Sequence, residues 1–178
     1  MSSPRSLSKK LALTTGALGA ALTLGAFGST AAAGAAPTHH NPAPNKPIIT
    51  DSFTVIDSSN QTLCDVYSYF TPGTNKGEVN TICRTKHEPV NVVPNCPPTP
   101  STKPVLTTFG TRGKLDCTSQ GSPMHNVTHL QVGQTKTATP AGHGAPVTIT
   151  ALQNGIFKIS GPAGSIGKIG PGMMRVEA

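Results

Sequence analysis

"TLCDVYSYFTPGTNKGEVNTICRT", residues 62–85, is the stretch that decides the fold. Two runs in which apolar and polar residues alternate flank TPGTNK (71–76), whose Pro, Gly and Asn are typical turn residues. This pattern predicts a β-hairpin. If TPGTNK is the loop, Phe70 lies opposite Gly77, and the same register places Cys64 opposite Cys83. The hairpin therefore predicts a disulfide between its own two strands.

Alternation along the two strands also assigns each side chain to a face of the sheet. One face is mainly apolar and is expected in the core: Cys64, Val66, Phe70, Val79 and Cys83. The other face is mainly polar and is expected in contact with water: Asp65, Tyr67, Tyr69, Glu78, Asn80 and Arg84.

The chain has four cysteines, and pairing Cys64 with Cys83 leaves Cys96 with Cys117. Zinc is the competing use of four cysteines, but the sequence has no Cys-x-x-Cys spacing. We therefore expect two disulfides, which are typical of an exported protein, and neither a metal nor a cofactor.

Short β-branched runs separated by Gly, Pro, Asn and Ser continue along the chain, and no apolar stripe keeps a helical period. The expected strands are 48–57, 62–70, 78–85, 104–110, 114–119, 126–133, 146–152, 155–160 and 173–178. Short strands at this spacing predict a single all-β domain stapled by disulfides. A β-sandwich is the expected architecture, and a small β-barrel is the alternative.

Three segments between these strands carry expectations of their own. Asn154-Gly155 is the favoured pair for a two-residue hairpin turn, which would place Leu152 opposite Phe157. "SGPAGSIGKIGPG" (160–172) is expected to be a turn-rich connection because of its glycines. Residues 86–103 hold five prolines, so they are expected to form a long surface loop or a sheet edge.

The first residues differ in kind from the rest of the chain. Arg5, Lys9 and Lys10 precede an uncharged run that ends in small residues, which is the order of a secretory signal peptide. A membrane-spanning helix is the alternative, but the run is diluted by Gly and Thr. We expect a signal peptide over 1–35, a disordered Pro/Asn-rich lead-in over 36–47 and the all-β domain over 48–178. The Ala/Gly-rich leader is typical of bacteria.

Removal of the leader takes away three of the fourteen basic residues and none of the seven acidic ones, so the net charge falls from +7 to +4. The remaining lysines are scattered and aromatic residues are few, which gives nucleic-acid binding little support. We expect a mature protein without a membrane span, released outside the cell or loosely retained in its wall.

No pattern typical of an assembled catalytic site is present: the sequence lacks Gly-x-Ser-x-Gly and His-Glu-x-x-His. A secreted, non-enzymatic binding protein is therefore the expected function, with an extracellular protein or a cell-surface ligand as its partner. An unrecognised secreted enzyme stays an alternative, because catalytic sites are geometric rather than sequential.

Candidate binding residues lie on the polar face of the hairpin and just beyond it. Tyr67 and Tyr69, with Arg84 across the hairpin, are of the residue types that anchor interfaces. Lys86, in "CRTKHEP", suggests a second alternative, an extracellular protease inhibitor whose basic side chain stands on a rigid, protruding loop. A carbohydrate-binding module is disfavoured, since the chain has no Trp and two Tyr.

Overall fold

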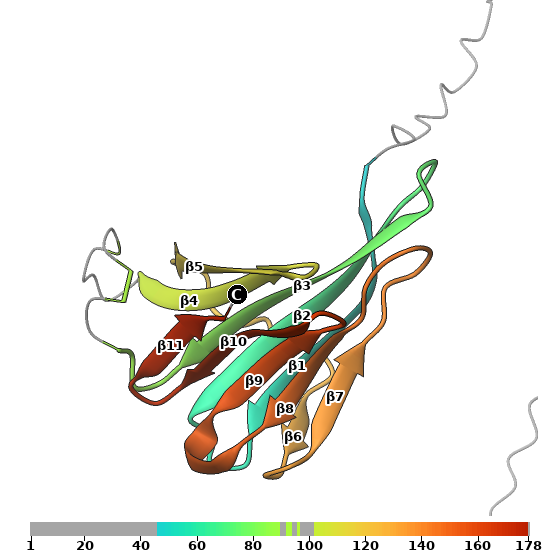
Figure 1. The fold of residues 1–178 in the computed structure, drawn as a ribbon. Helices are drawn as coiled ribbons and strands as arrows, with labels where there is room; N and C mark the ends of the chain where they lie inside the picture. Colours follow the sequence, from blue (N-terminus) through green and yellow to red (C-terminus); the bar gives the residue numbers. More distant parts are fainter. Residues whose placement is uncertain (1–45, 90–91, 94–95, 97–101, 178) are drawn as a thin grey trace, which may run out of the picture. The chain divides into compact units, whose positions relative to one another are not determined.

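The computed structural model describes residues 46–89, 92–93, 96 and 102–177. These residues form two β-sheets that pack face to face (Figure 1). The predicted all-β sandwich is confirmed, and the barrel alternative is not the architecture, since the strands form two separate sheets. The predicted signal peptide (1–35) and residues 36–45 of the predicted lead-in lie outside the described residues.

Sheet A has six strands in the order β5-β4-β3-β2-β1-β6. They are β1 (Ile48–Asp57), β2 (Thr62–Thr71), β3 (Lys76–Thr85), β4 (Lys103–Phe109), β5 (Arg112–Thr118) and β6 (Thr128–Leu130). Neighbours are antiparallel except for β6, which runs parallel to β1. To reach β6 from β5, the chain must cross from one edge of sheet A to the other.

Sheet B has five antiparallel strands in the order β11-β10-β9-β8-β7. They are β7 (Thr135–Ala138), β8 (Val147–Ala151), β9 (Phe157–Gly161), β10 (Gly164–Gly170) and β11 (Met173–Val176), and a 3-10 turn, η1 (Gln153–Gly155), joins β8 to β9.

The predicted register of the 62–85 hairpin is confirmed: Phe70 faces Gly77 and Cys64 faces Cys83. The face assignment follows from it. Cys64, Val66 and Val79 are buried in the core between the sheets, where they meet Ile149, Phe157 and other apolar residues of sheet B. Both expected disulfides are present: Cys64–Cys83, which the register predicts, and Cys96–Cys117, the pair that this leaves.

The predicted register of the second hairpin is wrong by one residue. Phe157 pairs with Ala151 instead of Leu152, because η1 and its flanking residues form a longer connection than a two-residue turn. Asn154 and Gly155 do adopt the positive φ angles that the Asn-Gly pair favours, at 60° and 67°. The shift places Ala151 and Phe157 together in the core.

The expectation of a turn-rich connection over 160–172 is also wrong, because these residues contain strand β10. Two of its glycines lie where neighbouring atoms leave little room for a side chain, while Gly164 at its start has a positive φ of 124°. A Cβ on Gly167 would lie 2.8 Å from the carbonyl oxygen of Arg175, and one on Gly170 would lie 2.6 Å from Cγ1 of Ile156. A larger residue at either position would therefore force neighbouring atoms of sheet B to move.

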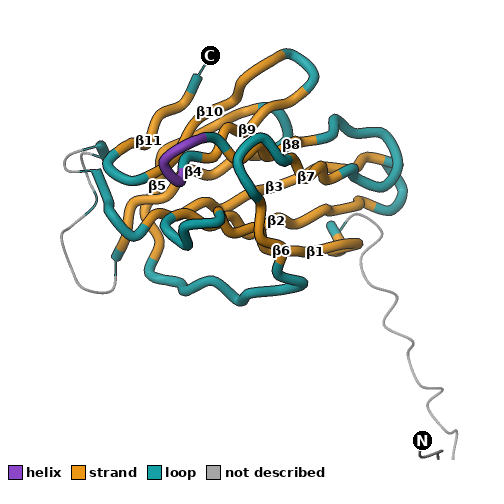
Figure 2. The backbone as a smooth tube through the Cα atoms, turned by 90° about the horizontal axis from the view of Figure 1, so that it is seen from below, coloured by secondary structure: helices purple, strands orange, loops and turns teal. Residues whose placement is uncertain are grey.

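The segment between β5 and β6 (119–127), which we call the crossover, runs over the face of sheet A that points away from sheet B. Figure 2 shows it as the long loop on the outer side of β1, β2 and β3. Within the described part of the chain, no helix is long and apolar enough to cross a membrane.

Candidate functional site

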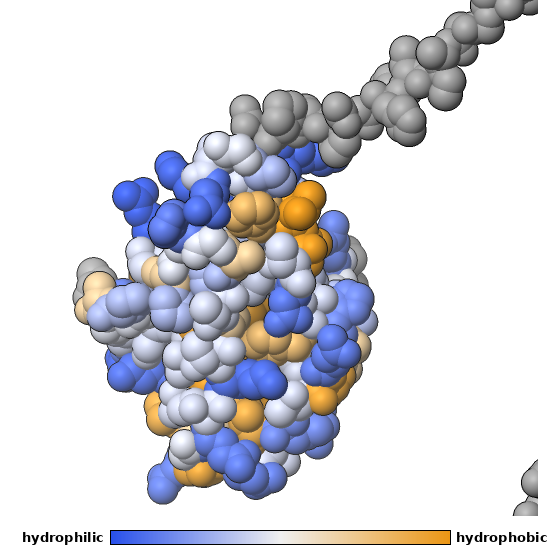
Figure 3. Space-filling view, turned by 90° about the vertical axis from the view of Figure 1, so that its right-hand side faces the viewer, coloured by the Kyte–Doolittle hydropathy of each residue, from blue (hydrophilic) through white to orange (hydrophobic). Residues whose placement is uncertain are grey.

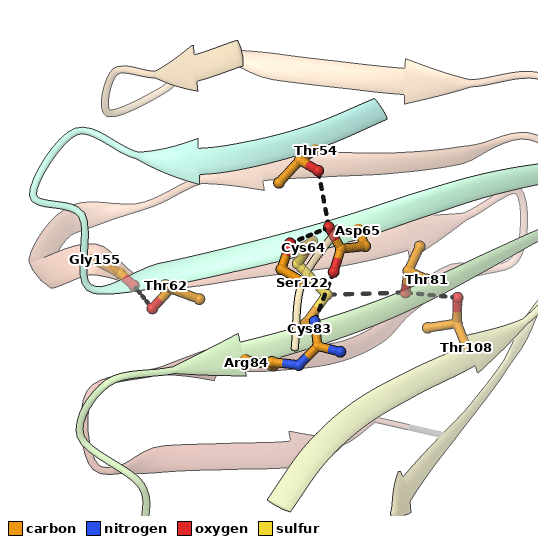
Figure 4. Close-up of a disulfide and its surroundings, with 10 residues drawn as sticks. All are labelled: Thr54, Thr62, Cys64, Asp65, Thr81, Cys83, Arg84, Thr108, Ser122 and Gly155. Atoms are coloured by element: carbon orange, nitrogen blue, oxygen red, sulfur yellow. Dashed lines mark hydrogen bonds and ion pairs between the residues drawn. A yellow bond between two sulfur atoms is a disulfide. The ribbon is translucent and has the colours of Figure 1, made fainter. Parts of the chain in front are cut away.

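Asp65 holds the crossover on the outer face of sheet A (Figure 4). Its carboxylate accepts hydrogen bonds from Thr54 Oγ1 of β1 at 2.8 Å and from Ser122 Oγ of the crossover at 2.6 Å. Arg84 Nη1 of β3 donates to the same carboxylate at 2.6 Å, with the Asp65 side chain only 2% exposed. A buried carboxylate is stable only when it is paired and hydrogen-bonded in this way, so Asp65 joins three segments.

The guanidinium group of Arg84 therefore has a structural role. Its Nη2 also donates to the carbonyl oxygen of Gln120 at 3.2 Å, and its side chain is only 12% exposed. Arg84 does lie on the same face of the sheet as the two tyrosines, as the sequence predicts. The crossover, however, covers the half of that face on which Arg84 lies. Arg84 therefore does not extend an open surface around Tyr67 and Tyr69.

The other half of the outer face, toward the loop of the β2–β3 hairpin, is open. Tyr69 faces Ile49 of β1, and Tyr67 faces Asn80, which in turn faces Phe109 of β4. Phe109 is 52% exposed and Ile49 is 56% exposed, whereas both tyrosines are half-buried. We call Ile49, Tyr67, Tyr69 and Phe109 the aromatic face. Figure 3 shows hydrophobic side chains near the start of β1, bordered by hydrophilic ones.

The two tyrosines lie side by side on β2, with ring centroids 6.4 Å apart and planes tilted by 39°. Burial raises the pKa of Tyr67 above its ordinary value of 10.0, and the negative charge of Asp65 raises it further, while Arg84 opposes the shift. The Tyr67 hydroxyl is therefore neutral at physiological pH and can donate a hydrogen bond.

A groove of about 820 Å³, which we call the Tyr69 groove, opens beside the aromatic face where β4 ends and β3 continues. Its lining comes from β2, β3, the adjoining ends of β4 and β5 with the turn between them, and the β7–β8 loop: Tyr69, Asn80, Phe109, Arg112 and His143 are among the residues. Asn80 Oδ1 is buried there and accepts no hydrogen bond from any residue in the described part of the chain. The groove therefore offers aromatic surface and an unsatisfied polar atom to a ligand.

Basic groups outnumber acidic ones around this groove. Lys76 and Arg112 line it with the exposed His143, and Glu78 is the carboxylate among its lining residues. Within the described part of the chain, neither Lys76 nor Arg112 makes an ion pair. The Tyr69 groove thus carries a small positive excess at neutral pH.

Lys86 lies directly after β3, where its backbone N–H donates to the carbonyl oxygen of Gln61 at 2.8 Å. This bond holds it against the β1–β2 turn, so residues 84–86 do not form the apex of a projecting loop. Lys86 and Arg84 line a second pocket, beneath Met124 of the crossover, which is separate from the Tyr69 groove. The four predicted site residues are therefore divided between two places.

Sequence reasoning misses Phe109 and Arg112 of the groove. Both lie in or beside predicted strands, but their place next to Asn80 depends on the pairing of β3 with β4. The long proline-rich connection between these strands leaves that register open. The sequence contains only part of the information needed to find Phe109. Alternation along 104–110 indicates that Phe109 shares a face with Thr107, but it does not indicate the neighbouring residue on β3.

Among the residues that the structure describes, no group of three or more His, Cys, Asp or Glu side chains could hold a metal ion. No known protein family, curated protein or solved structure matches the chain.

Proposed function

We propose that this protein is a secreted, non-enzymatic binding module that holds an acidic segment of an extracellular protein in the Tyr69 groove and on the aromatic face. The observation that carries the proposal is the uneven cover of sheet A. The crossover seals the half around Asp65 and leaves the half around Tyr67, Tyr69 and Phe109 open. Exposed aromatic side chains on a rigid sheet provide contact area at little entropic cost.

The charge of the groove determines the chemistry of the partner. Lys76 and Arg112 line the groove together with Tyr69 and Phe109, and Glu78 offsets only part of the charge of the two cations. An acidic partner segment would pair with these groups, and its backbone N–H or a side-chain donor would satisfy Asn80 Oδ1. Such a contact should weaken as ionic strength rises.

Secretion is part of the proposal and is supported by the leader and by the disulfides, which persist in oxidising compartments. A protease inhibitor acting through Lys86 has less support, since that residue is held against Gln61 near a strand end. Retention in the cell wall would follow from the partner, if the partner is itself fixed there.

The proposal is tested with the oxidised protein, from residue 36 onward, and a library of displayed peptides that includes acidic, neutral and basic segments. Enriched peptides are then titrated calorimetrically against the parent protein and against Tyr69→Ala and Phe109→Ala. We expect acidic peptides to be enriched and each variant to bind at least tenfold more weakly, as for central interface aromatics.

Val132→Ala is the matched control, because Val132 is 56% exposed but does not line the groove. Its affinity should equal that of the parent. Enrichment of basic peptides, or acidic peptides whose affinity is unchanged by both aromatic substitutions, would contradict the proposal. The same variants then show whether partners captured from secreted or wall fractions use this face.

A further inference from the structure

The pocket beneath Met124 has an apolar interior. Ile56 of β1 and Leu63 of β2 face each other on the outer side of sheet A and form its floor, and Met124 of the crossover lies beside them. The volume is about 420 Å³, within the range of small-molecule sites. We call it the Met124 pocket.

The backbone of Met124 has an unusual conformation. Its φ is 55°, in the left-handed region that residues with a side chain rarely adopt, and its N–H bonds Ser122 Oγ at 3.3 Å. Ser122 in turn bonds Asp65, so the Asp65 network fixes the backbone from which Met124 projects. The side chain itself is 52% exposed, and its flexible thioether can adapt to an apolar ligand.

Several polar groups of this pocket are basic. Lys86 and Lys103 line it; Lys103 pairs with Glu88 at 2.8 Å, while Lys86 makes no ion pair within the described part of the chain. Two lining residues each bury an atom that has no hydrogen-bond partner among the residues that the structure describes, Arg84 Nε and Gln61 Oε1. A buried N–H donor without a partner is costly, so Arg84 Nε is best satisfied by an added acceptor.

We propose that the Met124 pocket binds an amphipathic monocarboxylic acid, a small molecule with one carboxylate and an aliphatic or aromatic body. The apolar body lies against Ile56, Leu63 and Met124. The carboxylate accepts hydrogen bonds from Lys86 Nζ and Arg84 Nε, and its charge offsets the excess of basic groups. This inference does not depend on the proposed function, since the Tyr69 groove is a different site.

The proposed ligand chemistry predicts how the affinity should differ among four probe compounds. Decanoate should bind more tightly than hexanoate, because each buried methylene adds about fourfold to the affinity. Decanol, which lacks the charge, and decyltrimethylammonium, which reverses it, should both bind at least fivefold more weakly than decanoate.

The test uses oxidised protein in which the methionine methyl groups carry ¹³C, with decanoate as the probe. Nuclear magnetic resonance should show the Met124 methyl signal shifting on titration, with those of Met173 and Met174 in sheet B unchanged. Calorimetry measures the affinity of the parent and of two variants. Lys86→Met should weaken the binding of decanoate about fivefold, and Leu63→Gln should weaken it at least tenfold. Lys86→Met should leave the affinity for decanol unchanged.

Lys158→Met is the matched control, because Lys158 lies on β9 of sheet B, away from the pocket. The inference is overturned if decanoate shifts no Met124 signal at millimolar concentration, if decanol binds as tightly as decanoate, or if Lys86→Met and Lys158→Met have equal effects. Binding to anionic phospholipid vesicles without binding of free decanoate would also overturn it, since it would indicate a membrane surface as the ligand. Loss of the Tyr69 groove interaction leaves all of these readouts unaffected.

Discussion

Arg84 Nη1 and Asp65 Oδ2 lie 2.6 Å apart across β2 and β3, and both side chains are covered by the crossover. The pair stands on the side of sheet A that strand alternation predicts to face water. It therefore does two things at once: it fixes a loop over the sheet, and it marks the boundary between the sealed half and the open half of the outer face.

Asp65→Asn should destabilise the protein by about 3 kcal/mol, because Arg84 would keep its buried charge without a counter-ion. Urea unfolding followed by circular dichroism measures the free energy of unfolding. Asp116→Asn is the control, since its pair with Lys114 is 45% and 65% exposed and should contribute less than about 1 kcal/mol. Equal losses in the two variants would show that the Asp65 network does not hold the crossover.

The Tyr67 hydroxyl should ionise above the ordinary tyrosine pKa of 10.0, since burial and the Asp65 charge both disfavour the phenolate. In the variant Tyr69→Phe, Tyr67 is the one remaining tyrosine, so its ultraviolet titration can be followed alone. The midpoint should lie above 10.0 and should fall when Asp65→Asn is added. A midpoint at or below 10.0 would mean that the Tyr67 ring is solvated.

The two disulfides should differ in their resistance to reduction. Cys64 and Cys83 are completely buried in the core, whereas Cys96 and Cys117 are partly exposed. A thiol reagent should therefore reduce Cys96–Cys117 first in the native protein and reach Cys64–Cys83 only after denaturant is added. Alkylation followed by mass spectrometry distinguishes the two pairs, and equal reduction rates would contradict their different burial.

Gly77→Ala should destabilise the protein by about 1–3 kcal/mol, because the new Cβ would lie 1.9 Å from the carbonyl oxygen of Ala141 and displace the β7–β8 loop. That loop places His143 in the Tyr69 groove, so peptide binding there should weaken as well. Gly121→Ala is the control, since a Cβ at Gly121 meets no atom within 4 Å. Thermal unfolding compares the two, and similar midpoints would show that the loop adapts without cost.

Acid should destabilise the protein partly through Glu177. Its hydrogen bond from Ser165, together with Lys168 and Arg175, lowers its pKa from 4.5 to about 2. A group whose pKa is depressed in the folded state stabilises it above the unfolded pKa and loses that effect as the pH falls through the folded pKa. The contribution is thus complete above pH 4.5 and lost between pH 4.5 and 2.

Glu177→Gln should accordingly flatten the fall in unfolding free energy between pH 5 and pH 2, as measured by urea unfolding at each pH. The pKa of Asp57 is also lowered in the folded protein, so Asp57 contributes to acid sensitivity in the same direction as Glu177. Burial alone would raise this pKa, but hydrogen bonds from Ser59, Thr62 and Gln61 outweigh that effect. The double variant with Asp57→Asn should be flatter still. A variant as acid-sensitive as the parent would rule out these carboxylates as the cause.

The 62–85 hairpin shows how far local information reaches. Alternation, turn residues and two cysteines at matching positions define one register, because any slip would move Val66 and Val79 out of the core. The all-β fold class follows in the same way from many short alternating runs. Both depend on residues that are close together in the chain.

Local information fails where contacts between distant segments decide the conformation. Gly167 and Gly170 resemble turn residues in the sequence, yet they lie in a strand where Arg175 and Ile156 approach closely, which no local pattern reveals. The one-residue error after Asn154 has a similar origin: local preference predicts the positive φ angles but not the length of the connection around η1.

The sequence by itself determined the fold class, the central hairpin, its disulfide and the face on which Tyr67, Tyr69 and Arg84 lie. Only the tertiary structure decided which of these side chains remain open. The reason is physical: a strand's alternation divides its residues between two faces, but what covers a face depends on segments far away in the chain. Here the crossover buries Arg84 and leaves the tyrosines beside Phe109.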